Sequence, residues 1–120
     1  MNISKPLSIS TLSHKNEINS VMKKGQKVYT KFGLLFLYND NIKVLNKVGI
    51  LVKKQSGNAV KRNYIKRILR QFVRNEHEFL RYYSKIIFLY NYSGKISYNE
   101  LRNTYINDLK KYEKIITNSH

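Results

Sequence analysis

Residues 57–70 read Gly57-Asn58-Ala59-Val60-Lys61-Arg62-Asn63-Tyr64-Ile65-Lys66-Arg67-Ile68-Leu69-Arg70, inside a segment from Lys53 to Arg74 that has eight basic side chains and no acidic one. At 100° per residue, a helix would gather one set of side chains within roughly 140° of arc: Arg62, Lys66, Arg70, Asn63, Arg74 and Arg67. A second set falls between roughly 200° and 340°: Tyr64, Ile68, Phe72, Ile65 and Leu69. The stretch therefore predicts a helix with one face on a core and one facing a polyanion, because unpartnered clustered cations repel each other.

The composition indicates one folded domain with a basic surface. The chain has 120 residues, of which 42% are hydrophobic, and this is enough to bury a core. Its formal net charge is +16, and charge of this size on a small domain predicts salt-dependent binding to nucleic acid. The alternative is a generally basic protein whose lysines are only solvated.

Several classes of site are disfavoured by residue content. The chain has no cysteine, which excludes disulfides and thiolate metal sites. His14, His77 and His120 are far apart and lack ligand spacing, so we expect no metal site in the protein. The sequence has no apolar run of ~20 residues and no apolar signal segment at its start, so we expect a cytoplasmic protein without a membrane partner.

The first half of the chain predicts a loose segment, a helix and a sheet. Residues 1–13 are rich in serine and read as a flexible leader. Ser13 is a candidate N-cap for a helix that ends at Gly25. Strand-forming residues run from Val28 to Tyr38, as one strand or as two, and a second segment runs from Ile42 to Lys53. The turn signal at residues 39–41 predicts that these segments pair as an antiparallel hairpin.

The second half of the chain predicts two helices around a strand. The basic helix is expected to continue to about Leu80, and residues 86–90 form a short apolar run that suits a buried strand. Ser97 and Glu100 have the spacing of a capping box for the last helix. Residues 114–120 are expected to fray, which leaves a single domain over residues 14–113. The predicted order is αββαβα, or αβββαβα if the first strand is split.

Residues 54–70 resemble the signature of the bacterial ribonuclease P protein component. That signature places a lysine, Gly, Ala-Val, Arg-Asn, Lys-Arg and a final Arg at set spacings, and every fixed position is met here. The similarity extends to Ile18, Val21 and Gly25 upstream, and to Ser97-Tyr98-Asn99-Glu100 downstream. It covers roughly residues 12–112.

The resemblance implies a fold, an activity and partners. The fold is an α/β sandwich of αβββαβα order, with an antiparallel or mixed central sheet and a left-handed βαβ crossover, like ribosomal protein S5 domain 2. The catalyst is an RNA subunit, and the Mg²⁺ that it binds activates the water that cuts precursor tRNA at its mature 5′ end. The protein is an accessory subunit, one per RNA, with no cofactor of its own.

The resemblance and the charge pattern together assign candidate site residues. The predicted RNA-binding set is Lys53, Lys54, Gly57, Asn58, Lys61, Arg62, Asn63, Lys66, Arg67, Arg70 and Arg74. The resemblance also implies a cleft for the single-stranded 5′ leader, lined by Ile18, Met22, Lys31, Leu34 and Phe36. The family commonly has aromatic residues at the two helix positions of this cleft, whereas Ile18 and Met22 are aliphatic.

Three other functions compete with this interpretation. A ribosomal or RNA-assembly protein would share the charge but not the spaced motif. A self-sufficient nuclease would need clustered acids, and the seven acids here are scattered along the chain. A membrane-surface helix would match the basic pattern, but the flanking strands indicate that its apolar face is already buried.

Overall fold

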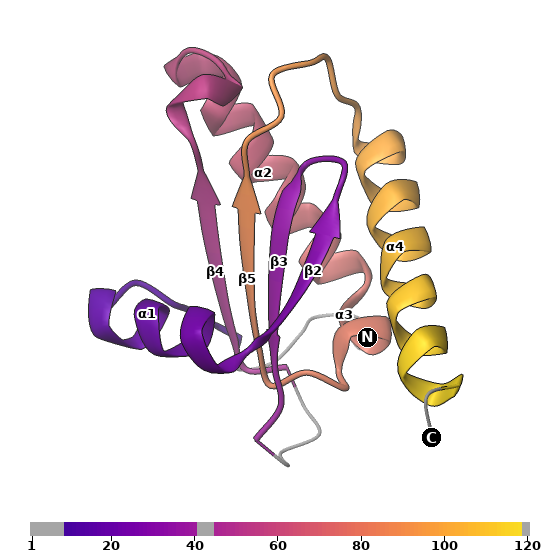
Figure 1. Ribbon diagram of the computed structural model, residues 1–120. Coiled ribbons are helices and arrows are strands. Elements are labelled where there is room, and N and C mark those ends of the chain that lie inside the picture. Colours follow the sequence, from indigo (N-terminus) through magenta and orange to yellow (C-terminus); the bar gives the residue numbers. More distant parts are fainter. Residues whose placement is uncertain (1–8, 41–44, 119–120) are drawn as a thin grey trace, which may run out of the picture.

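The computed structural model describes residues 9–40 and 45–118, and its element order is that of an α/β sandwich (Figure 1). The elements are β1 (Ser10–Thr11), α1 (Lys15–Lys24), β2 (Gln26–Thr30), β3 (Gly33–Tyr38), β4 (Lys47–Val52), a 3₁₀ turn (Lys54–Ser56), α2 (Ala59–Asn75), α3 (His77–Leu80), β5 (Lys85–Tyr90) and α4 (Tyr98–Asn118).

The sheet has the order β1-β4-β5-β3-β2, and the predicted hairpin between the first two strand segments is wrong. β5 lies between β3 and β4, with Phe88 opposite Leu35 on one side and Ile50 on the other. Both faces of β5 are buried, through Ile86 and Phe88 on one face and Ile87 on the other, so β5 takes the centre of the sheet. The hairpin of this fold is β2–β3, closed between Thr30 and Gly33.

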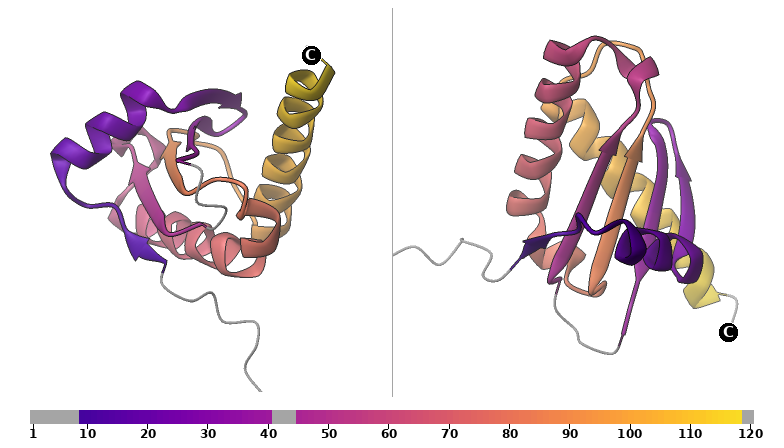
Figure 2. Two further views of the ribbon diagram at one scale, coloured as in Figure 1. Left: turned by 90° about the horizontal axis from the view of Figure 1, so that it is seen from below. Right: turned by 90° about the vertical axis from the view of Figure 1, so that its left-hand side faces the viewer.

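Helices cover the two faces of the sheet unequally (Figures 1 and 2). α2 and α4 cover one face, where Ile65, Leu69, Phe72 and Tyr105 form the main core with alternate residues of the strands. On the other face α1 packs a smaller cluster, which contains Leu12, Val21, Phe36 and Ile87. α1 crosses only one end of the strands (Figure 1), so part of this face of the sheet stays uncovered.

The β4–α2–β5 crossover is left-handed, as the resemblance implied. β4 and β5 are parallel neighbours. With both strands pointing up and β5 to the right of β4, α2 lies behind the sheet (Figures 1 and 2). Nearly all such crossovers in proteins are right-handed. The handedness is therefore a distinctive feature of this fold.

Several boundaries differ from those predicted. His14 rather than Ser13 precedes α1, without a side-chain cap. Ser10 and Thr11 pair with β4 and Leu12 is buried, so this part of the predicted loose leader is ordered; residues 1–8 lie outside the described residues. The basic helix ends at Asn75, because the chain turns at Glu76 and α3 carries Leu80 back into the core.

The last helix follows the prediction at its start but not at its end. The Ser97 hydroxyl accepts a hydrogen bond from the Glu100 N–H at 3.2 Å, which confirms the cap. The Glu100 carboxylate does not return to Ser97 and instead accepts from Lys31 Nζ at 2.8 Å. The helix runs to Asn118, past the predicted fraying point. Across the described residues, no helix combines the length and apolarity that crossing a membrane requires.

Candidate nucleic-acid interface

The basic face of α2 forms as the helical arithmetic predicts. Ile65, Ile68, Leu69, Phe72 and Val73 are buried, whereas four polar side chains of the predicted basic arc are exposed: Asn63, Arg67, Arg70 and Arg74. One apolar residue, Val73, falls within the basic arc; it is buried and lines a hollow together with Val48 and Ile50 of β4. Arg62 and Lys66 lie on either side of Val73 in this arc and are half-buried, so they form one border of the exposed basic face.

The start of α2 is held by local hydrogen bonds. Asn58 Oδ1 accepts from the Lys61 N–H at 2.9 Å, which caps the helix. Gly57 has a φ of 146°, a conformation that side chains rarely adopt. Lys61 Nζ donates to the Ser93 carbonyl, so this cation is directed to the loop after β5. The exposed Lys53 and Lys54 continue the basic surface beyond the helix.

The predicted cleft residues separate into three groups. Ile18, Met22 and Leu34 are half-buried at the edge of the small cluster under α1. Phe36 is only 2% exposed and belongs to the interior of that cluster. The structure does not bring Lys31 to the others: it lies in the β2–β3 turn on the α4 side, ion-paired with Glu100 and 5.3 Å from the Tyr92 ring centroid.

A hollow of about 410 Å³ connects the α1 face to the border of the basic helix. Its apolar lining includes Met22 of α1, Leu51 of β4 and Leu89 of β5, and its cations are Lys53 and Lys66. Leu51 and Leu89 were not predicted. Their alternation within apolar strands was a usable signal, but it could be read only once β4 and β5 were known to be neighbours.

The register of the sheet aligns four side chains on the α1 side of the sheet, hereafter the transverse row. Leu51 lies opposite Leu89, Leu89 opposite Leu34, and Leu34 opposite Tyr29. Directly opposed residues point to the same face of a sheet. The transverse row therefore runs from the hollow beside Lys66 to Tyr29 in β2, which sequence analysis also did not identify.

An acidic side chain positions α1 on the sheet. Glu17 Oε2 accepts from Lys47 Nζ of β4 and lies 3.8 Å from Lys85 Nζ of β5. The hydrogen bond from Lys47 lowers the pKa of the Glu17 carboxyl, and the nearby charges act in the same direction. The Glu17–Lys47 ion pair thus joins β4 to α1, the helix whose Met22 lines the hollow.

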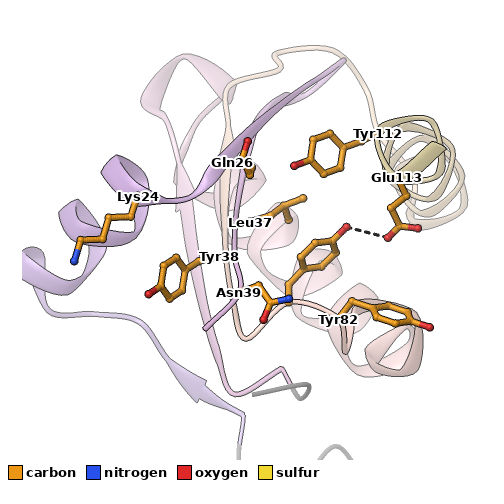
Figure 3. Close-up of a pocket in the computed structure, with 9 residues that line it drawn as sticks. Lys24, Gln26, Leu37, Tyr38, Asn39, Tyr82, Tyr112 and Glu113 are labelled. Atoms are coloured by element: carbon orange, nitrogen blue, oxygen red, sulfur yellow. Dashed lines mark hydrogen bonds between the residues drawn. The ribbon is translucent and has the colours of Figure 1, made fainter. Parts of the chain in front are cut away.

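A second hollow lies at the opposite end of the strands (Figure 3). It measures about 600 Å³ and is lined by Lys24, Gln26, Leu37, Tyr38, Asn39, Tyr82, Tyr83, Tyr112 and Glu113. The Tyr83 hydroxyl donates to the Glu113 carboxylate at 2.9 Å, and burial raises the pKa of Tyr83. Among the described residues that line it, the one cation, Lys24, is offset by Glu113, so its charge does not favour a polyanion.

The described residues show no group of three or more His, Asp or Glu side chains arranged to hold a metal ion. Glu17, Glu76 and Glu100 each form an ion pair with a basic side chain. The geometry therefore presents cations and apolar surface rather than a cluster of acids.

Comparison with known proteins identifies the family. The family model described as Ribonuclease P matches residues 8–113. The chain is 31% identical over 104 residues to the ribonuclease P protein component of Natranaerobius thermophilus, covering 86% of this chain and 90% of the relative. It is 34% identical over 101 residues to that of Finegoldia magna, with 83% and 88% covered.

Solved structures agree with the sequence comparison. A mutant of the Staphylococcus aureus RNase P protein, described as defective in mRNA degradation, superposes with a TM-score of 0.73 at 25% identity, covering 86% of this chain and 87% of that one. The Thermotoga maritima RNase P protein gives a TM-score of 0.71 at 19% identity, with 84% and 96% covered, and shows the same fold. The matched residues include α1, the whole sheet and α2, and the chain therefore belongs to the ribonuclease P protein family.

Proposed function

We propose that this chain is the protein subunit of a ribonuclease P holoenzyme, which binds the catalytic RNA through α2 and the 5′ leader of precursor tRNA through the α1 side of the sheet. The RNA subunit, with the Mg²⁺ that it holds, cuts the precursor at the mature 5′ end. The protein supplies no catalytic side chain. One protein acts with one RNA, in the cytoplasm.

The observation that carries this proposal is the hollow shared by the two surfaces. Lys66 belongs to α2 and Met22 to α1, yet both line the hollow, together with Leu51 and Leu89. An RNA strand bound there meets cations at one border and apolar side chains on the floor. Single-stranded nucleic acid uses both, because its phosphates need neutralising and its unstacked bases present apolar faces.

The basic face of α2 suits the backbone of a folded RNA. Arg67, Arg70 and Arg74 are exposed on one face, and arginine presents a planar set of donors that can bind phosphate or base edges. Neutralising phosphates releases condensed counterions. We therefore expect the holoenzyme to need less Mg²⁺ than the RNA alone to hold its active fold.

The test is precursor-tRNA cleavage at low Mg²⁺ by a bacterial catalytic RNA, with this protein, without it, and with protein alone. We expect protein-dependent cutting at the mature 5′ end and no cutting by the protein alone. RNA binding without stimulation by the cognate catalytic RNA would favour the ribosomal or assembly-protein alternative. Cutting by the protein alone would overturn the assignment of catalysis to RNA.

A further inference from the structure

Tyr29 is an exposed aromatic side chain on the α1 side of the sheet. The residue is 78% exposed. Its neighbour Val28 is buried in the core under α2 and α4, and successive residues of a strand point to opposite faces. Tyr29 therefore faces the same side as α1.

The position of Tyr29 in the sheet indicates that its exposure is relevant to ligand binding. Single exposed apolar residues are common and need no explanation. Tyr29, however, ends the transverse row, which begins at Leu51 beside Lys66 and Lys53. Strands lie ~4.8 Å apart, so three intervals place the two ends of the row ~14 Å apart.

The surroundings of Tyr29 suit a nucleotide. Leu34 lies directly opposite and is half-buried, so it adds apolar surface next to the ring. Lys27 is two residues earlier on the same strand, hence on the same face, and is exposed. An aromatic ring with a cation close along the strand is the combination that binds a base by stacking and its phosphate by charge.

We propose that Tyr29 is the base-stacking residue of the leader groove and that it contacts an unpaired leader nucleotide distant from the cut site. This inference rests on the proposed function, in which the leader lies on the α1 side. Ile18 and Met22 give α1 an aliphatic wall without an aromatic face, and Phe36 is buried. Tyr29 is the exposed aromatic side chain that the described part of this face offers.

The test compares holoenzymes that contain wild-type protein, Tyr29→Phe or Tyr29→Ile. Isoleucine keeps the strand propensity and apolar character of the site but removes the ring, which separates stacking from a structural role. Tyr82→Ile is the matched control, because Tyr82 is a tyrosine that is 56% exposed and lies outside the transverse row. Thermal unfolding of each variant checks that the domain is intact.

Binding is measured for precursor tRNAs with a long leader and with a leader of one nucleotide. We expect Tyr29→Ile to weaken long-leader binding about five- to 160-fold, the range for loss of one stacked base, and to leave short-leader binding unchanged. Tyr29→Phe and Tyr82→Ile should match the wild type. A fluorescent base analogue moved along the leader should lose its quenching at one position in Tyr29→Ile.

Two results would overturn the inference while leaving the proposed function in place: long-leader binding that is unchanged in Tyr29→Ile, or a loss in Tyr29→Phe as large as in Tyr29→Ile. The second result would assign the effect to the hydroxyl group. A wild-type holoenzyme that binds long and short leaders equally would instead remove leader binding from the proposed function, and the inference with it.

Discussion

Glu17 links α1 to two strands, and its titration gives a residue-scale prediction. Its pKa is lowered from the ordinary 4.5, chiefly by the hydrogen bond from Lys47. A carboxyl whose pKa is lowered by folding stabilises the fold above its unfolded pKa, and this contribution disappears as the pH falls through the folded value. Glu17→Gln should therefore have a lower urea midpoint than wild type at pH ~7, and the difference should shrink below pH ~4.5.

The control for this prediction is Glu78→Gln. Glu78 is exposed and pairs with Arg81 one turn away on the same segment, so its ion pair joins no separate elements. We expect Glu78→Gln to track the wild type across the pH range. A gap between Glu17→Gln and wild type that stays constant down to pH ~3 would show that the loss comes from packing rather than from charge.

Tyr29 shows why one residue of the site could not be predicted. If residues 28–38 formed one continuous strand, Tyr29 and Leu34 would point to opposite faces, because they are five positions apart. The chain instead turns at Lys31 and Phe32, and the hairpin places Tyr29 directly opposite Leu34 on one face. The two-residue turn therefore decides which side chains share the α1 side of the sheet. The sequence pattern was compatible with one strand or with two, so it did not predict this turn.

At the scale of elements, the start of α2 gives a prediction that separates stability from RNA contact. Asn58 caps the helix through its side-chain oxygen, so Asn58→Ala should cost about 1 kcal/mol in the free energy of unfolding. Asn58→Asp keeps a capping oxygen and adds a negative charge that suits a helix N-terminus. In the proposed complex the added carboxylate would repel phosphate, so we expect Asn58→Asp to be as stable as wild type but to bind the catalytic RNA more weakly.

Denaturant unfolding and RNA titration of the three proteins measure the two effects separately. Equal RNA affinity for wild type and Asn58→Asp would place this end of α2 away from the RNA. A loss of stability in Asn58→Asp that equals the loss in Asn58→Ala would show that the cap depends on the amide group and not on the oxygen alone.

Element types could largely be predicted from the sequence, whereas strand pairing could not. The sequence patterns located the basic helix, the apolar strand predicted at residues 86–90 and found at Lys85–Tyr90, and the helix capped by Ser97. The predicted hairpin between β3 and β4 is wrong. Strands that follow each other in the chain often pair, but here the more apolar β5 takes the position between them at the centre of the sheet. β5 displaced this hairpin, since its two buried faces need neighbours on both sides. The parallel β4–β5 pair then brings Leu51 next to Leu89 and forms the floor of the hollow.

At the scale of the whole molecule, the helices on the two faces of the sheet bury hydrophobic clusters of very different size. α2 and α4 share the large core, so that layer supplies most of the buried apolar surface. α1 rests on a much smaller cluster and leaves the transverse row partly exposed, since Leu34, Leu51 and Leu89 are half-buried and Tyr29 is exposed. Stability thus comes mainly from one side of the sheet. The α1 side keeps a partly exposed surface, and this is the surface where we propose that the leader binds.

The net charge of +16 makes salt dependence the property that tests the whole interface. The logarithm of the RNA-binding constant should fall linearly with the logarithm of salt concentration, with about 0.7–0.9 in slope for each phosphate neutralised. Removing two phosphate contacts with Arg62→Ala and Lys66→Ala together should lower the magnitude of the slope by about 1.5. Lys110→Ala with Lys111→Ala removes the same charge from the exposed surface of α4 and should leave the slope nearly unchanged, because long-range charge is screened within ~10 Å at 0.1 M salt. Equal slope changes for the two double variants would mean that RNA responds to total charge alone, and the assignment of α2 as the contact surface would fall.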